Sequence, residues 1–273
     1  MIMTVGLIIE EIKECLTSAN YPATEIRAIT HILFRHFCGL EPAGLYLNLN
    51  KGVEPAIAAQ IIAALQRLKK YEPLQYILGE TEFYGLKFTV NKNVLIPRPE
   101  TEELVHWIIS DYKTFKQTPF SILDIGTGSG AIAVSLAKNM PDATVYALDI
   151  SAEALQTASK NAEQNAVKVN FIQQDILDDI ELPRQFDCIV SNPPYVRNSE
   201  KQLMHSNVLD YEPHSALFVD DNNPLIFYDA VARVAKRYLK PDGAVYVEIN
   251  EALPGETQEV FRTYGYQTII IND

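Results

Sequence analysis

Residues 121–137 read SILDIGTGSGAIAVSLA, in which one apolar run ends in a glycine-rich loop and a second apolar run begins. The first run predicts a buried strand and the second a helix, with Gly126, Gly128 and Gly130 between them. Glycine permits a tight turn and a close approach to a ligand, and a helix N-terminus offers free N–H groups to an anion. No Lys follows the last glycine, which excludes the phosphate loop of a nucleotide hydrolase.

An acidic residue closes the next predicted strand. Asp149 ends the segment VYALD, 23 residues beyond Gly126, where a carboxylate can accept hydrogen bonds from a ribose diol. The loop alone leaves the ligand open, because Gly126, Gly128 and Ala131 also satisfy the pattern of a nicotinamide dinucleotide site. A strand-to-helix turn that binds nothing is the simplest alternative.

Strands and helices alternate on both sides of this loop. Such alternation predicts an α/β domain with a mostly parallel sheet covered on both faces and with ligands at the carboxyl ends of the strands. The predicted strands are Phe120–Ile125, Thr144–Asp149, Val169–Gln174, Phe186–Ser191, Gly243–Ile249 and Tyr266–Ile271. The predicted helices are Ala131–Met140, Ala152–Gln164, Leu225–Leu239 and Pro254–Tyr264.

The N-terminal third has a different pattern. Over residues 1–78 apolar residues recur every three and four positions, which predicts a small helical bundle interrupted near Pro22, Pro42 and Pro55. Residues 79–97 place aromatic and β-branched residues among glycines, which predicts a β-hairpin. We therefore expect an N-terminal helical domain (1–78), a hairpin linker (79–97) and a catalytic α/β domain (98–273).

The segment NPPY at 192–195 follows the predicted strand FDCIVS. Two prolines stiffen the turn and remove two backbone donors, Asn192 supplies an amide acceptor, and Tyr195 supplies a flat ring. This set suits a planar amide or amino group, whose two hydrogens would be held by the Asn192 side-chain oxygen and by a backbone carbonyl of the proline pair. Held in this way, a poorly nucleophilic nitrogen has its lone pair aimed at an electrophile, for which a sulfonium methyl is the natural candidate.

DIGTGSG at 124–130 followed by NPPY resembles the amino-methylating group of class I S-adenosylmethionine-dependent methyltransferases. Two further segments are more specific. EPLQYILGETEFYGLKFTVNKNVLIPRPETEELV at 72–105 and YEPHSAL at 211–217 closely resemble the family of peptide chain release factor N5-glutamine methyltransferases. The resemblance runs through nearly the whole chain, and it implies a Rossmann-like, mostly parallel seven-stranded sheet.

The resemblance also implies a reaction and a set of site residues. The side-chain amide nitrogen of the glutamine in the Gly-Gly-Gln motif of class I release factors would be methylated from S-adenosyl-L-methionine, leaving S-adenosyl-L-homocysteine, without a metal. Catalysis would fall to Asn192, Pro193 and Tyr195, and substrate binding to Asn192–Tyr195, Arg98 and Glu100 in the pocket wall. The expected cofactor-binding residues are Asp124, Gly126, Thr127, Gly128, Ser129, Gly130, Asp149, Ile150, Asp175, Ile176 and Asn192.

The chain departs from the family pattern at four places. EIN at 248–250 stands where Glu-Ile-Gly is usual, and DDNNPLIFY at 220–228 replaces a segment richer in glycine. Ile176 occupies an often aromatic position, which predicts weaker stacking on adenine. The chain ends at Asp273, from which we expect a shorter edge of the sheet.

Net charge separates this interpretation from its nearest alternative. An adenine-N6 nucleic-acid methyltransferase could use NPPY equally well, but a charge of −12 with no basic stretch does not favour extrusion of a base from DNA. A nicotinamide-dependent oxidoreductase would leave NPPY unexplained, and Asn192 argues against a non-catalytic binding module.

Cysteine and hydropathy patterns indicate the setting in which the protein works. Three cysteines without a CxxC spacing predict neither a disulfide framework nor a zinc site, and they fit the reduced cytoplasm. No stretch predicts a signal peptide or a membrane span. We expect a cytoplasmic monomer that docks release factors with its helical bundle and binds no nucleic acid stably.

Overall fold

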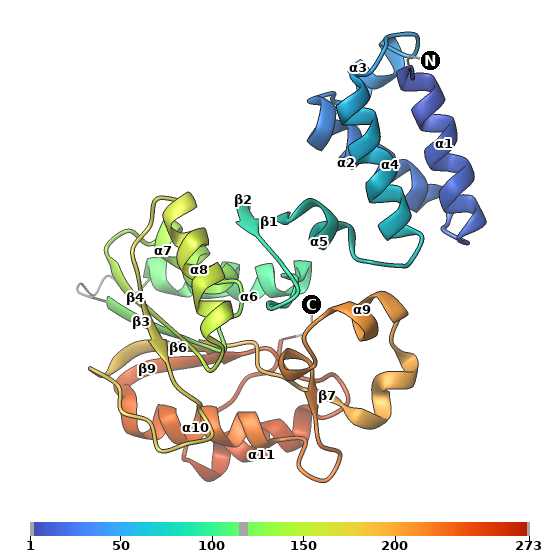
Figure 1. Ribbon diagram of the computed structural model, residues 1–273. Helices are drawn as coiled ribbons and strands as arrows, with labels where there is room; N and C mark the ends of the chain where they lie inside the picture. The colour runs from blue at the N-terminus through green and yellow to red at the C-terminus, as the bar shows by residue number, and fades with distance from the viewer. Residues whose placement is uncertain (1–2, 115–119, 272–273) are drawn as a thin grey trace. The chain divides into compact units, whose positions relative to one another are not determined.

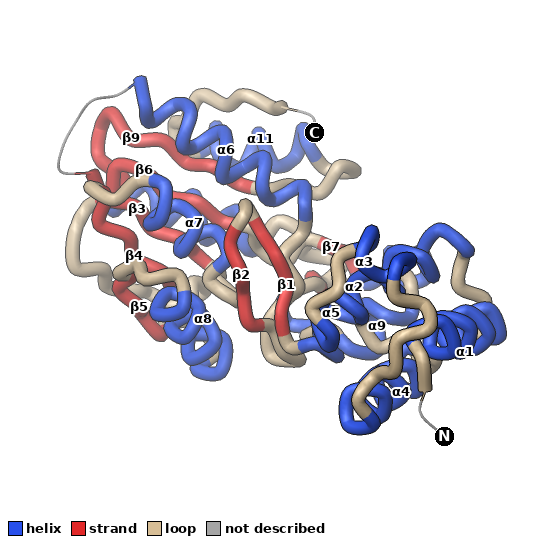
Figure 2. The backbone as a smooth tube through the Cα atoms, turned by 90° about the horizontal axis from the view of Figure 1, so that it is seen from above, coloured by secondary structure: helices blue, strands red, loops and turns tan. Residues whose placement is uncertain are grey.

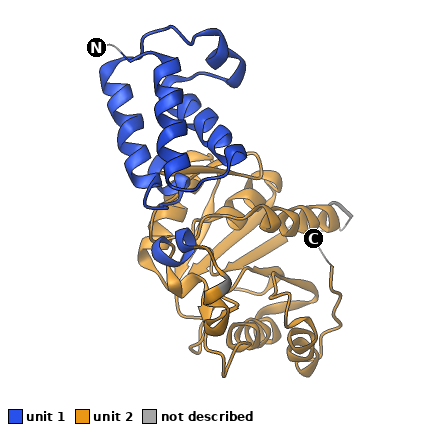
Figure 3. Cartoon of the chain, turned by 90° about the vertical axis from the view of Figure 1, so that its right-hand side faces the viewer, with its two compact units in different colours: residues 1–78, 206–211 blue, residues 79–205, 212–273 orange. Residues whose placement is uncertain are grey.

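The structure is a computed structural model that describes residues 3–114 and 120–271. The chain forms two compact units, Met1–Leu78 with Ser206–Tyr211, and Gly79–His205 with Glu212–Asp273 (Figure 3). The short segment Ser206–Tyr211 was expected within the α/β domain, but it groups with the helical unit. Within that unit the Tyr211 hydroxyl donates a hydrogen bond of 2.9 Å to the carbonyl of Lys70.

The helical unit is a bundle whose helix ends follow from its sequence (Figure 1). Thr4 caps the first helix by accepting from the N–H of Leu7, Gly39 ends the second in a left-handed conformation, and prolines begin the third and fourth. The apolar faces meet in a core that includes Ile12 and Leu33. The helices are α1 (Val5–Ser18), α2 (Ala23–Cys38), α3 (Pro42–Leu47), α4 (Pro55–Leu68), α5 (Leu74–Leu78) and α9 (Ser206–Tyr211).

The second unit is built on a parallel sheet with the strand order β5-β4-β3-β6-β9. All four ladders are parallel, so the carboxyl ends of the strands lie along one edge. Residues alternate between the two faces: Ile122 packs into one core and Leu123 into the other. The strands are β3 (Phe120–Ile125), β4 (Ala143–Asp149), β5 (Val169–Gln173), β6 (Phe186–Ser191) and β9 (Leu239–Val247).

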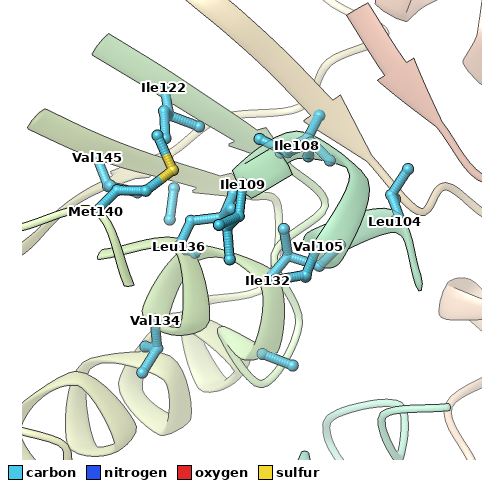
Figure 4. Packing of buried hydrophobic residues seen from close by; sticks show 14 of the residues in the cluster. Leu104, Val105, Ile108, Ile109, Ile122, Ile132, Val134, Leu136, Met140 and Val145 are labelled. Carbon is cyan, nitrogen blue, oxygen red and sulfur yellow. The ribbon is translucent and has the colours of Figure 1, made fainter. Parts of the chain in front are cut away.

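Helices cover both faces of this sheet, as Figures 1 and 2 show. α6 (Pro99–Thr114) and α7 (Ala131–Asn139) pack on the face that carries Ile122, and Figure 4 shows Val105 and Ile109 of α6 beside Ile132 and Leu136 of α7. α10 (Ile226–Tyr238) and α11 (Pro254–Thr263) pack on the opposite face. α8 (Ala152–Gln164) contacts β4 and β5, and also the hairpin strand β2.

The hairpin joins β1 (Glu80–Phe83) to β2 (Leu86–Thr89) through Tyr84 and Gly85, both at positive φ. Its end is fastened to α8 by one fully buried side chain. The Asn161 amide accepts from the Thr89 N–H at 2.7 Å, and donates to the carbonyls of Thr89 at 3.0 Å and Ser129 at 2.8 Å. Asn161 therefore ties the hairpin to the glycine loop.

The sheet and one helix also differ from the sequence prediction. Of the seven expected strands six were assigned to segments, and five of these form the sheet in the described residues. The sixth, Tyr266–Ile271, forms no ladder and leaves Ile269 and Ile271 exposed, and no other described segment joins the sheet as a seventh strand. Asp273 lies outside the described residues. The helix α6 was not predicted, although Pro99 and Glu100 in its first turn are typical of a helix start.

Four shorter elements complete the described part of the second unit. A two-stranded parallel pair joins β7 (Val196–Arg197) to β8 (Phe218–Val219), and two 3₁₀ turns, Asn198–Leu203 and His214–Ala216, lie in the same stretch. The pair fastens the chain directly after the NPPY turn.

Candidate active site

The glycine loop after β3 has its backbone open on one side. Gly126, Gly128 and Gly130 all have φ between 54° and 81°, a region that residues with a Cβ rarely adopt. At Gly126 and Gly128 a Cβ would meet nothing, whereas at Gly130 it would lie 3.0 Å from the Cβ of Ala158. The first two glycines therefore leave space for a ligand, and the third allows the loop to pack against α8.

The buried carboxyl of Asp124 supports the loop from beneath. Its Oδ2 accepts from the Thr127 hydroxyl at 2.6 Å and from the Ala133 N–H at 3.2 Å. Its Oδ1 is buried with no hydrogen-bond partner among the described residues. Burial raises the pKa of Asp124 to about 7, although both hydrogen bonds act in the opposite direction.

Asp149, at the end of β4, is bound to the loop from the side. One carboxylate oxygen accepts from the Gly128 N–H at 2.8 Å and the other from the Ser151 N–H at 2.9 Å. Each oxygen keeps lone-pair capacity for a further donor. Burial raises the pKa of Asp149, and the backbone hydrogen bonds oppose that shift.

A cavity of about 300 Å³ lies along this edge of the sheet, which is a size typical of small-molecule sites. Most predicted site residues line it: Gly126, Gly128, Asp149, Ile150, Asp175, Ile176, Asn192, Pro193 and Pro194. Four predicted cofactor residues do not, namely Asp124, Thr127, Ser129 and Gly130. Asp124 lies in β3, and the other three belong to the loop without lining the cavity, so these four determine the shape of the loop.

Asn192 follows β6 and is held in one orientation. Its Nδ2 donates to the Thr101 hydroxyl at 3.1 Å and to Glu248 Oε2 at 2.9 Å. The two acceptor oxygens are themselves 2.7 Å apart, so both lie on one side of the amide and hold Nδ2 there. Oδ1 accepts no hydrogen bond from the described residues. The turn thus presents an uncharged acceptor beside the cavity.

Tyr195 lies outside the cavity lining. Its hydroxyl donates to Glu248 Oε1 at 2.8 Å, and its ring packs against the core on the α10 face. Burial, followed by the neighbouring Glu248 carboxylate, raises the pKa of the Tyr195 phenol, so the phenol remains protonated and keeps donating this hydrogen bond.

Arg98 and Glu100 do not line the cavity either. Arg98 forms an ion pair of 2.6 Å with Glu212, whose side chain is 1% exposed and also accepts from the N–H of Ile96. Glu100 is exposed on the first turn of α6. Arg98 therefore anchors the segment before α6 within its own unit.

Sequence reasoning missed several residues of the site. Cavity walls come from the segment 93–95 after the hairpin, from Pro213, Ser215 and Ala216, and from Phe227 of α10. The segment YEPHSAL at 211–217 contains Pro213, Ser215 and Ala216 and carries part of the family resemblance, but the sequence analysis predicts no place in the site for these residues. Thr101 and Glu248 were also missed. Glu248 comes directly after β9, the neighbour of β6, so strand order could have placed it beside Asn192.

The described residues hold neither a metal cluster nor a helix that could span a membrane. There, no group of three or more His, Cys, Asp and Glu side chains is arranged to hold a metal ion. No helix in residues 3–114 or 120–271 has both the length and the apolar character needed to cross a bilayer.

The comparisons with known proteins agree with this geometry. Residues 112–211 match the methyltransferase small domain family, and residues 8–79 match the PrmC N-terminal domain family. Two ligand-facing loops on the carboxyl edge of a parallel sheet, one rich in glycine and one carrying an amide acceptor, place the chain among class I S-adenosylmethionine-dependent methyltransferases.

Individual relatives narrow this class. The chain is 50% identical over 244 residues to the release factor glutamine methyltransferase of Flavobacterium psychrophilum, covering 89% of this chain and 86% of that protein. It is 44% identical over 256 residues to the enzyme of the same name from Bacteroides thetaiotaomicron, covering 93% and 90%. The chain belongs to the release factor glutamine methyltransferase family. Among solved structures, a methyltransferase from Pyrococcus furiosus aligns with a TM-score of 0.47 at 22% identity, covering 77% of this chain and 87% of that one.

Proposed function

We propose that this protein transfers a methyl group from S-adenosylmethionine to the side-chain amide nitrogen of the glutamine in the Gly-Gly-Gln motif of class I release factors. One observation carries the proposal: Nδ2 of Asn192 donates to protein acceptors while its Oδ1 accepts from none of the described residues, so Oδ1 is offered to a substrate donor beside the cavity. A primary amide nitrogen is such a donor, and it carries two hydrogens.

The chemistry requires help from the protein because an amide nitrogen is a weak nucleophile. In the proposed complex Asn192 Oδ1 accepts one N–H of the substrate glutamine, and a backbone carbonyl of Pro193 or Pro194 accepts the other. Prolines suit this task because they fix the turn and add no competing N–H. Fixing both hydrogens orients the lone pair, so that positioning contributes much of the rate enhancement.

The cavity fits the cofactor that this reaction needs. Gly126 and Gly128 leave open space where other residues would place a Cβ, and Asp149 keeps acceptor capacity for two ribose hydroxyls. Asp175 and Ile176 line the same cavity and would edge the adenine. The bound cofactor supplies an electrophilic methyl group on a sulfonium. Asp124 and Thr127 act one layer below by holding the loop in shape.

The division of labour between the units is part of the proposal. The helical unit would dock the release factor, and the second unit would bind the cofactor and the glutamine. The match of residues 8–79 to the PrmC N-terminal domain family supports this division. We further propose that the protein acts as a cytoplasmic monomer without stable nucleic-acid binding, in line with its net charge of −12.

Transfer of a radiolabelled methyl group from S-adenosylmethionine tests the proposal. Purified class I release factor, the same factor with the motif glutamine changed to Ala, and duplex DNA would serve as parallel substrates. We expect label on the native factor alone. Label on DNA would favour an adenine-N6 activity instead. Cofactor binding without label on any substrate would indicate a different protein substrate.

A further inference from the structure

The carboxylate of Glu248 lies at the centre of a hydrogen-bond network that joins three elements. Its Oε2 accepts from the Thr101 hydroxyl at 2.7 Å and from Asn192 Nδ2 at 2.9 Å, while its Oε1 accepts from the Tyr195 hydroxyl at 2.8 Å. Thr101 is 4% exposed on α6, the other two donors belong to the turn after β6, and Glu248 itself follows β9. The carboxylate therefore receives three donors and gives none.

The backbone of Glu248 is held as firmly as its side chain. Its N–H donates to the carbonyl of Ser191 at 3.1 Å, and its carbonyl accepts from the Tyr228 hydroxyl at 3.3 Å. Because β9 pairs with β6 up to Val247 opposite Ser191, residues 192 and 248 leave the sheet side by side. The position of the carboxylate is thus determined by the sheet.

A carboxylate in this place decides which end of the Asn192 amide faces the cavity. The oxygen and nitrogen of an asparagine side chain are nearly equal in size, so shape alone does not distinguish the two orientations. An ionised carboxylate only accepts, so it selects the orientation in which Nδ2 points towards it. The Thr101 hydroxyl donates to Glu248, which leaves its lone pairs free to accept from Nδ2 as well. With the amide reversed, Oδ1 would face the carboxylate and the cavity would meet a donor.

We propose that Glu248 is a positioning residue for methyl transfer: its carboxylate, with Thr101, turns the Asn192 carbonyl oxygen towards the substrate amide and holds the Tyr195 ring in place. The inference rests on the proposed function and extends it to residues that do not touch the substrate. Glu248 does not line the cavity, and its oxygens already accept three donors, so it is not placed to take the proton that the methylated amide loses.

Two substitutions that keep the length of the side chain distinguish a positioning role of Glu248 from a purely structural role. In Glu248→Gln the side-chain oxygen can still accept from Asn192 and Thr101, with the new N–H turned to the Tyr195 oxygen. In Glu248→Met the carboxylate is lost and only the Thr101 hydroxyl remains. A hydroxyl can donate as well as accept, so Asn192 loses its preference for one orientation. We expect kcat on release factor to fall at least 30-fold in Glu248→Met but at most about fivefold in Glu248→Gln. The cofactor Kd from calorimetry should stay within about threefold of wild type in both.

The matched control is Glu251→Met, an exposed neighbour with the same change of side chain, which should keep wild-type kcat. Thr101→Val and Thr101→Ser provide a second pair in case Glu248→Met does not fold. The valine variant removes the hydroxyl at nearly constant shape and should lose about three- to tenfold in kcat, while the serine variant should lose less than twofold.

Failure of the inference can be distinguished from failure of the proposed function. If wild-type protein leaves the release factor unlabelled, the proposed function is wrong. If wild type labels it and Glu248→Met keeps kcat within twofold, the positioning role is wrong. Equal losses in Glu248→Gln and Glu248→Met, or a loss of cofactor binding that parallels the loss of kcat, would also overturn it, because both indicate general damage to the fold.

Discussion

The loop after β3 and the turn after β6 lie on the same edge of one sheet, yet they are built in opposite ways. The first consists of glycines at positive φ. Asp124 and Thr127 support it from its own segment, and Asp149 and Asn161 bind it from 21 and 32 residues away. The second consists of prolines, and its supports come from 91 and 56 residues away, at Thr101 and Glu248. The backbone shape of the first is determined by its own glycines, whereas the orientation of Asn192 in the second depends on tertiary contacts.

This difference suggests a division of function. A loop whose shape is determined by its own glycines suits a cofactor that is bound through many backbone contacts. A stiff turn clamped from distant elements suits a substrate group that must be held at one angle. Substitutions in the two regions should therefore produce different defects: in the turn a loss of turnover, and in the loop a loss of stability or of cofactor affinity.

The largest effect is expected in the turn. Asn192→Ala removes the acceptor for the substrate amide, and we expect kcat to fall by a factor of about 10² to 10³, the range found when one positioned hydrogen-bonding group is lost from an active site. The cofactor Kd from calorimetry should change by less than about threefold. Asn223→Ala, on an exposed loop, is the control and should have no effect. A turnover close to wild type would contradict the proposed clamp.

In the loop, Gly130→Val should destabilise the fold by about 3 kcal/mol, because a β-branched residue is forced to positive φ and crowds its neighbour. The φ is 81° and the added Cβ would lie 3.0 Å from Ala158. Chemical denaturation measures the effect. Gly255→Ala is the comparison, because a Cβ there meets nothing and φ is not positive, so its stability should match or exceed wild type. Equal stability of both variants would show that α8 moves away from the loop easily.

The next effect concerns cofactor affinity. Asp149→Ala should weaken S-adenosylmethionine binding by about 1 to 3 kcal/mol, the range for a lost hydrogen-bond acceptor of full charge. It also frees the N–H groups of Gly128 and Ser151, which adds to the loss. Asp142→Ala, exposed just before the same strand, controls for the change in net charge. Unchanged affinity by calorimetry would rule out Asp149 as the ribose ligand.

The smallest effect is a change in pH dependence. Burial raises the pKa of Asp124 to about 7, so the folded protein holds this proton at pH values where the unfolded chain, with a carboxyl pKa of 3.8, has lost it. The stability that the group contributes is complete below the unfolded pKa and is lost as pH rises through about 7. The Asp124→Asn variant cannot ionise and should lack this decline.

Chemical denaturation of wild type and of Asp124→Asn at a series of pH values tests whether stability falls as the pH rises. The stability of wild type relative to the variant should decrease by about 1 kcal/mol or more between about pH 5 and about pH 8, given 1.36 kcal/mol per pKa unit. Curves that stay parallel would show that Asp124 is ionised in the folded protein. The loop would then be supported by a charge, not by a neutral acid.

Much of the α/β fold was predictable because its signals are local. Strand β3, the three glycines, Asp149 and the NPPY turn are each encoded in a few consecutive residues, and the structure places them on one edge. α6 was not predicted, because the PRPE segment at 97–100 was interpreted as part of the pocket wall and not as the start of a helix. The prediction of a strand at Tyr266–Ile271 was wrong, because an apolar pattern indicates a strand only where a partner is available to pair with it.

The site was less predictable than the fold, for a physical reason. Residues that touch a ligand belong to motifs, but those that hold them, such as Thr101, Asn161 and Glu248, act through contacts between distant segments. A polar side chain of this kind looks like a surface residue in a sequence. Strand order corrects this interpretation, because it shows which residues follow neighbouring strands and therefore leave the sheet side by side.

The chain leaves the helical unit after Leu78, returns to it at Ser206 and leaves it again after Tyr211. The helical unit is therefore not a detachable N-terminal module. A gene fragment that starts at Gly79 would keep α9 but remove the rest of the unit to which it belongs. Where the chain re-enters the second unit after Tyr211, the first residue is Glu212, which is buried and forms an ion pair with Arg98. Exchange of the helical unit between related genes would have to transfer two separate segments, 1–78 and 206–211, at the same time. We therefore expect the helical unit to have been inherited together with the rest of the enzyme.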